Sequence, residues 1–186
     1  MEALGRLFDI GVGFAPVELN TADGATGKRI AMVGADAVTI VAFMDVAASG
    51  TDNLTFDIQQ HTAYTGGTSK DLDADPSTGA AGSVGIDHFY IKAETALDND
   101  EAWVRVSQTE ASEVVVAGAT YAAMQKLVVI EVASSQLAEG FTHLSVACTA
   151  GNVNQLGACL YFTHELRRQR KPTSLPNLLR TNAANA

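Results

Sequence analysis

The sequence has few aromatic residues, few cysteines and few prolines for its length. Aromatic residues make up 6% of the 186 residues, with one Trp, two Cys and four Pro. A single tryptophan gives poor support for a carbohydrate-binding surface, which needs a group of exposed rings. Two cysteines with no histidine at ligand spacing do not make a zinc site. We interpret Cys148 and Cys159 as reduced thiols in the core.

Long hydrophobic runs are also absent. No stretch approaches the roughly 18 apolar residues of a membrane span, so we expect no membrane contact. The first residues, MEALGRLFDIGVGF, lack a basic region followed by an uninterrupted apolar run. We therefore expect no secretory signal, and synthesis in the cytoplasm.

Motifs that carry catalytic or metal chemistry are missing. The segment DGATGKR (23–29) lacks the spacing of a phosphate-binding loop. The acids of 71–79 lack the glycine and glutamate positions of a calcium loop. Four histidines are scattered, although His143 and His164 end neighbouring expected strands and are candidates to meet in space. No base, nucleophile and orienting group occur together, so we expect neither an enzyme nor a cofactor or metal site.

Positive charge is scarce and unevenly placed. The net charge is −9, but the last twenty residues hold five basic side chains and no acid. The remaining 166 residues have seven basic and 21 acidic side chains, a net charge of −14. An acidic body argues against nucleic acid as the main ligand, because phosphate binding needs a wide basic face.

Short runs of β-branched and aromatic residues alternate with turn residues along the chain. In NLTFDIQQH (53–61), for example, Leu54, Phe56 and Ile58 face one way. The pattern predicts an all-β fold, an antiparallel β-sandwich that is jelly-roll-like with about nine or ten strands. Residues 65–85 are expected to be a long surface loop.

Aromatic residues and short helical signals complete this pattern. We interpret Phe89, Tyr90 and Trp103 as core anchors. Short turns of helix are expected within 120–127 and 134–139.

Two arms are expected to flank the sandwich of residues 15–166. The N-terminal arm, residues 1–14, has an apolar spacing that is also typical of a short amphipathic helix. The C-terminal arm, residues 167–186, is basic and contains prolines and leucines, which suits docking on an acidic, partly apolar surface. The expected interface residues are Leu4, Leu7, Phe8, Arg167, Arg168, Arg170, Lys171, Leu175, Leu178, Leu179 and Arg180.

Several segments, in order, resemble a group of small structural proteins of tailed bacteriophages. TAGNVNQLGACLYF (149–162) resembles the last core strand of that group. NLTFDIQQHTAYTGGTSKDL resembles its early hairpin, and AWVRVSQTEASEVV its tryptophan-containing strand pair. AVTIVAFMDV and VVIEVASSQLAEGFTHLSVAC are similar to further strands of the group, so that the resemblance covers about residues 12–165.

The resemblance implies a head-associated virion protein, a capsid decoration or cement protein, with no catalytic residues to transfer. The partners expected from it are the major capsid protein and further copies of this chain, with a trimer as our expectation. The protein would then reside on the capsid surface after synthesis in the host cytoplasm. Two alternatives remain open: a head-to-tail connector or tail-tube component that inserts residues 65–85 between subunits, and a carbohydrate-binding adhesion sandwich.

Overall fold

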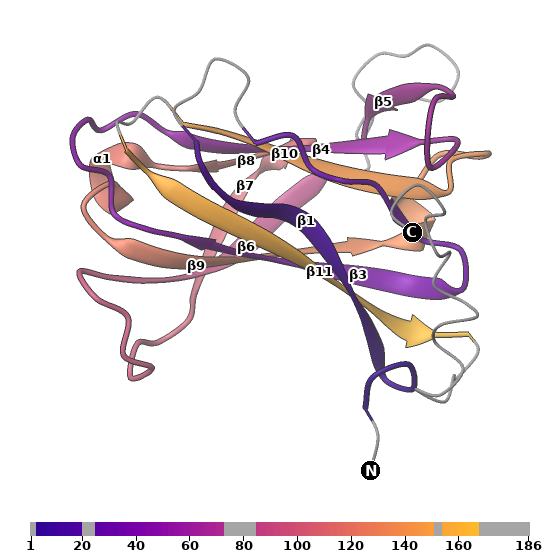
Figure 1. Cartoon of the computed structure of the whole chain (residues 1–186), viewed down its shortest axis with the longest axis horizontal. Coiled ribbons are helices and arrows are strands. Elements are labelled where there is room, and N and C mark those ends of the chain that lie inside the picture. Colours follow the sequence, from indigo (N-terminus) through magenta and orange to yellow (C-terminus); the bar gives the residue numbers. More distant parts are fainter. Residues whose placement is uncertain (1–2, 20–24, 73–84, 151–153, 168–186) are drawn as a thin grey trace, which may run out of the picture.

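Two antiparallel β-sheets pack face to face in a computed structural model of the chain, which describes residues 3–19, 25–72, 85–150 and 154–167 (Figure 1). The described residues form eleven strands and two short helical turns. The strands are β1 (Phe8–Glu18), β2 (Ile30–Ala31), β3 (Ala35–Met44), β4 (Leu54–His61), β5 (Ser69–Asp71), β6 (Ile86–Glu94), β7 (Val104–Ala111), β8 (Glu113–Val116), β9 (Gln125–Ala133), β10 (His143–Ala150) and β11 (Leu156–Leu166). The expected all-β sandwich is confirmed.

The chain passes repeatedly between the two sheets. One sheet has six strands in the order β1-β11-β3-β9-β6-β7. The other has five, with β2-β10-β4-β5 in line and β8 also paired to β4. Because β3 and β4, or β9 and β10, belong to different sheets, residues far apart in sequence become neighbours within each sheet. The helical turns α1 (Gly118–Tyr121) and η1 (Ser134–Gln136) lie on either side of β9 in the sequence.

The core lies between the sheets and is made by the alternating residues of their strands. In β4 the expected residues Leu54, Phe56 and Ile58 are all buried. Ile40 of β3 and Ile130 of β9 are fully buried and directly opposite each other in the six-stranded sheet. A side-chain period of two is what places one face of each strand in this core.

The two cysteines are buried in this core and are not disulfide-bonded, which confirms their interpretation as core thiols. Burial raises the pKa of both thiols, that of Cys159 to about 12, because the charged thiolate is disfavoured away from water. Neither thiol is therefore a nucleophile at neutral pH.

A buried tyrosine joins the two sheets through the core. Tyr161 of β11 is fully buried, and its hydroxyl accepts a hydrogen bond from the Val146 N–H of β10 at 2.9 Å. The same hydroxyl donates to the Lys28 carbonyl oxygen at 3.0 Å. Burial raises the pKa of the phenol, so the group stays protonated and able to donate.

The N-terminal region differs from the expected arm. Residues 8–14 are part of β1, an edge strand that pairs with β11 along most of its length. Before it, residues 3–7 form a turn in which the Gly5 N–H donates to the Phe8 carbonyl oxygen at 2.7 Å, rather than an amphipathic helix. Leu4 and Leu7 are exposed on this turn.

The expected C-terminal arm lies almost entirely outside the described residues. Only Arg167 of its basic and apolar positions is described; Arg168, Arg170, Lys171, Leu175, Leu178, Leu179 and Arg180 are not. Of the expected loop 65–85, β5 pairs with β4, and residues 73–84 lie outside the description. Among the described residues no helix is long and apolar enough to span a membrane.

Candidate functional site

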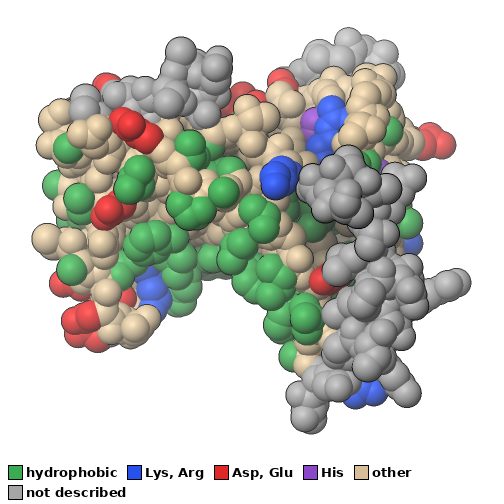
Figure 2. Space-filling model, viewed as in Figure 1, with side chains coloured by type: hydrophobic (Ala, Val, Ile, Leu, Met, Phe, Trp, Pro, Cys, Tyr) green, Lys and Arg blue, Asp and Glu red, His purple; other side chains and the backbone are tan. Residues whose placement is uncertain are grey.

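The outward side of the six-stranded sheet carries a band of apolar side chains, which we call the apolar face. Cross-strand partners project from the same side of a sheet, so the register identifies its members. The apolar face consists of Ile10, Val12, Val41, Phe43, Leu127, Val129, Leu156, Leu160 and Phe162. Five of them, Ile10, Val12, Phe43, Leu156 and Leu160, are between 40 and 51% exposed. Figure 2 shows hydrophobic side chains gathered over β1, β11 and the strands beside them.

The register places these side chains in continuous rows. Val12, Leu160, Val41, Val129 and Tyr90 are successive partners across β1, β11, β3, β9 and β6. Four strand spacings of about 4.8 Å make this row roughly 19 Å wide. A row of this width corresponds to a patch on the order of a few hundred Å², the size of the largest apolar patch on a typical monomer, which is often functional.

One end of the apolar face carries aromatic and cationic side chains. The Lys92 Nζ lies 5.2 Å from the centre of the Trp103 ring, and the His88 and Tyr90 rings are 5.4 Å apart in an edge arrangement. Trp103 is 48% exposed, so its interpretation as a core anchor is wrong. It immediately precedes the edge strand β7 on the outward side, where no second sheet packs. Of the three aromatics, only Phe89 lies in the core.

Phe8 is the expected interface residue that the structure joins to the apolar face. Its ring packs edge-on against Phe162, with 5.9 Å between the centroids. Leu4 and Leu7 lie next to it on the turn that precedes β1. Arg167 lies at the far end of β11, where its Nε donates to Asp36 Oδ1 at 2.7 Å and its N–H donates to the Gly34 carbonyl oxygen at 2.9 Å.

The outward side of the five-stranded sheet is different, and we call it the polar face. Its members, from the register of β4, β5 and β10, are Thr55, Asp57, Gln59, His61, Ser69, Asp71, His143, Ser145 and Ala147. His61, the last residue of β4, is at one end of it and is only 3% exposed. Its Nδ1 is 2.7 Å from Ser69 Oγ and its Nε2 is 2.7 Å from Ser145 Oγ.

Electrostatics keeps this imidazole neutral. Burial is the largest cause that lowers the pKa of His61 to about 4, and the nearby Arg29 and His143 add to it. The Arg29 guanidinium is itself held by the carbonyl oxygens of Ala63 at 2.8 Å and Gly66 at 2.6 Å. An imidazole with this pKa is a weak general base near neutral pH.

The histidine arrangement also lacks the third member of a catalytic triad. Both ring nitrogens of His61 are paired with serine hydroxyls, whereas a triad needs a carboxylate on one of them. His143 is the cross-strand partner of His61, and His164 pairs with Thr39 Oγ1 at 3.0 Å on the other sheet. The suggested meeting of His143 and His164 is therefore wrong.

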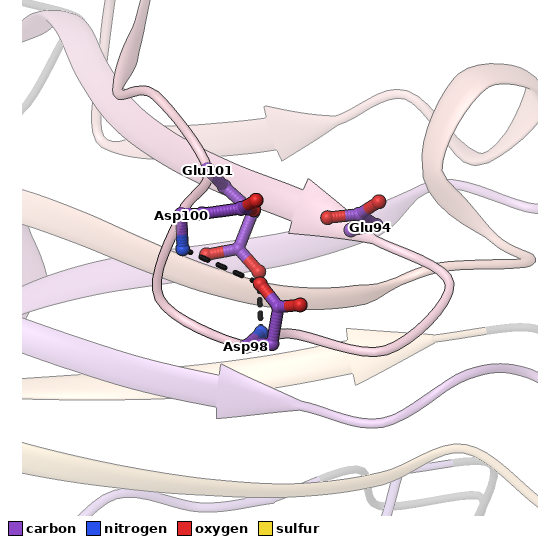
Figure 3. A group of neighbouring side chains, drawn as sticks. All are labelled: Glu94, Asp98, Asp100 and Glu101. Atoms are coloured by element: carbon purple, nitrogen blue, oxygen red, sulfur yellow. Dashed lines mark hydrogen bonds between the residues drawn. The ribbon is translucent and has the colours of Figure 1, made fainter.

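An acidic group lies in the connection between β6 and β7 (Figure 3). Carboxylate oxygens of Glu94, Asp98, Asp100 and Glu101 come within 4.8 Å of one another. The Asp98 N–H donates to Glu101 Oε1 at 2.6 Å, and the Asp100 N–H donates to Asp98 Oδ1 at 3.3 Å. Three of the four residues are exposed, and the carboxylates of Asp98 and Glu101 accept hydrogen bonds from backbone N–H groups of their own loop, so local loop structure accounts for these two.

Sequence reasoning missed the apolar face, although a signal was present. The segments AVTIVAFMDV and LGACLYF have apolar residues at both odd and even positions. A strand with that composition has two apolar sides, and only one of them is used by the core.

No protein-family model, no curated protein and no solved structure gives a significant match to this chain.

Proposed function

We propose that this chain is a non-catalytic structural protein that binds the capsid shell of a tailed bacteriophage in many copies, as a decoration or cement protein. The ordered resemblance along residues 12–165 supports the class of protein. The apolar face supports the mode of action, which is docking on another macromolecule.

The apolar face is the observation that carries this proposal. A sandwich needs apolar residues only on the inward sides of its two sheets. Here Phe43, Leu156 and Leu160 are exposed on the outward side of a body whose charge is −14. Covering a few hundred Å² of apolar surface at about 25 cal/mol per Å² yields several kcal/mol, a weak contact for one copy. Many copies on a symmetric shell turn such contacts into stable attachment.

The absence of catalytic geometry in the described residues supports the non-catalytic part. The polar face holds an imidazole with a pKa of about 4 between two hydroxyls. Both thiols are buried, and burial raises their pKa values.

A particle-binding assay with matched substitutions tests the proposal. Phe43→Asp and Leu160→Asp place a charge on the apolar face, and Val115→Asp places one on the strand β8, which flanks the polar face. All three side chains are 40 to 44% exposed, so the changes are equivalent in burial. We expect the first two variants to lose binding to purified shells and Val115→Asp to keep it. If all three bind as well as the unchanged chain does, the proposed function is wrong.

Copy number separates the decoration role from the connector alternative. A decoration protein occupies sites over the whole shell, whereas a connector forms one ring at a single vertex. Quantitative mass spectrometry of purified particles measures the difference directly.

Trp103 favours carbohydrate binding as a second candidate function. A half-exposed indole beside Lys92, Tyr90 and Arg105 has the ring and polar groups that a sugar needs. A glycan array comparing the unchanged chain with Trp103→Ala tests this candidate, and an array without hits removes it.

A further inference from the structure

The chain leaves the described fold at the end of β11, four residues beyond Phe162 of the apolar face. Leu166, the last residue of β11, pairs with Ala35 of β3, and both strands contribute to this face. The next residue, Arg167, is fixed there through its bonds to Gly34 and Asp36. Residues 168–186 therefore follow a strand that contributes to the apolar face of their own chain.

These nineteen residues are long enough to cross the apolar face. At about 3.3 Å per residue they reach up to roughly 63 Å, against a row about 19 Å wide. The distance to be covered is shorter than that reach: Phe43 is eight residues along β3 from Ala35, or about 26 Å.

The composition of the segment matches the surface it would cross. Leu175, Leu178 and Leu179 supply apolar side chains, and the segment contains no acid. The carboxylate of Glu131 is exposed beside the apolar face, opposite Thr39. Arg168, Arg170 and Lys171 come at the start of the segment, and Thr39, the partner of Glu131, is four residues along β3 from Ala35 at the exit point. Exposed ion pairs add little each, so the leucines must supply most of the contact.

We propose that residues 168–186 fold back over the apolar face of their own chain and cover it in the free protein. The same chain is favoured over a second copy because a short tether gives an effective concentration in the millimolar range. A shell would then have to displace this cover. The inference concerns the protein in solution and goes beyond the role on a shell, so it does not depend on that role.

A tryptophan reporter on the apolar face tests the inference in the full-length protein. Trp103→Phe removes the single natural tryptophan, and Phe43→Trp then places one reporter at the centre of the face. The matched control carries Trp103→Phe with Tyr64→Trp, near His143 at the polar face. Phe43 is 44% and Tyr64 46% exposed in the described fold, so uncovered reporters would be quenched alike. Each reporter is compared with and without the triple change Leu175→Ser, Leu178→Ser and Leu179→Ser.

We expect acrylamide to quench the reporter at 43 less than the reporter at 64. The triple change should raise quenching at 43, shift its emission to the red and increase binding of a hydrophobic dye. It should leave the reporter at 64 unchanged. Circular dichroism checks that each chain is folded.

Two results would overturn the inference. In one, the reporter at 43 is equally accessible with and without the triple change. In the other, the reporter is protected at high protein concentration but becomes accessible on dilution, because a second copy is then the cover. Neither result bears on particle binding, which the aspartate substitutions measure separately.

Discussion

The outward sides of the two sheets differ in whether their side chains are covered and paired within the chain. On the polar face, His61 is covered and both its ring nitrogens are paired, so backbone and side chains form a self-sufficient hydrogen-bonded surface. On the apolar face, Phe43 and Leu160 are exposed although no fold requirement places them there. A surface whose polar groups are hydrogen-bonded within the chain contributes to stability, whereas a surface of exposed apolar side chains is available for contact with another molecule. The difference between the two faces therefore distinguishes residues that stabilise the fold from residues that are available for binding.

The largest expected effect compares two phenylalanines on opposite sides of the same sheet. Phe89→Ala removes a ring that is 1% exposed in the core and should cost about 3–5 kcal/mol of unfolding free energy. Phe43→Ala removes a half-exposed ring and should cost about 1 kcal/mol or less in the folded domain. Urea unfolding measures both. Equal losses would mean that Phe43 belongs to a packed core, and the contrast between the faces would fail.

A pH-dependent effect is expected for the polar face. The pKa of His61 is about 4 in the folded chain against 6.5 when unfolded, so the unfolded state takes up the proton first. His61 should thus contribute stability that is present above pH 6.5 and lost as pH falls towards 4. We expect the unfolding free energy to fall by about 1–2 kcal/mol. This is less than the energy equivalent to the full pKa shift, because the ring is near the surface.

The difference between the unchanged chain and His61→Gln isolates this contribution from the titrating carboxylates. If the difference between the unchanged chain and His61→Gln is constant from pH 7 to 4, the neutral buried imidazole is the wrong description.

The next comparison is between single hydroxyls on the two faces. Ser145→Ala leaves the buried Nε2 of His61 without its partner and should cost about 1–2 kcal/mol. Thr39→Val removes the hydroxyl that pairs with the partly exposed His164, and water can replace it, so about 0.5 kcal/mol or less is expected. Thermal unfolding of the two variants ranks them, and the reverse order would contradict the assignment of the polar face as a stabilising network.

The smallest effect concerns the ion pair between Arg167, which follows β11, and Asp36 of β3. Arg167 and Asp36 are both largely exposed, so Arg167→Gln should change the unfolding free energy by less than about 1 kcal/mol. A double-mutant cycle with Asp36→Asn measures the pair directly. A coupling energy well above this value would indicate that the exit point of the chain is more rigidly held than an exposed pair allows.

The sequence predicted the sandwich because local alternation is sufficient to define most strands. Leu54, Phe56 and Ile58 are buried as expected, and so are both cysteines. β1 was not predicted, since FDIGVGFAPVE contains two glycines, a proline and two irregularities of register that interrupt the alternation.

What lies on each outward side was harder to predict, for a topological reason. Periodicity tells which residues share a side but not whether another sheet covers that side, which is why Trp103 was misplaced. His61 and Ser145 are 84 positions apart, and only the pairing of β4 with β10 brings them together. No local spacing contains that information.

The hydroxyl of Tyr161 has a mechanical consequence. It connects β11, which contributes to the apolar face, to β10 of the other sheet and to the Lys28 carbonyl oxygen in the segment before β2. One sheet can slide over the other only by breaking these two bonds in a dry interior, where their loss is costly. A mechanical force applied at the apolar face is therefore transmitted to both sheets. A binding partner on that face would act on the whole sandwich and not on one sheet alone.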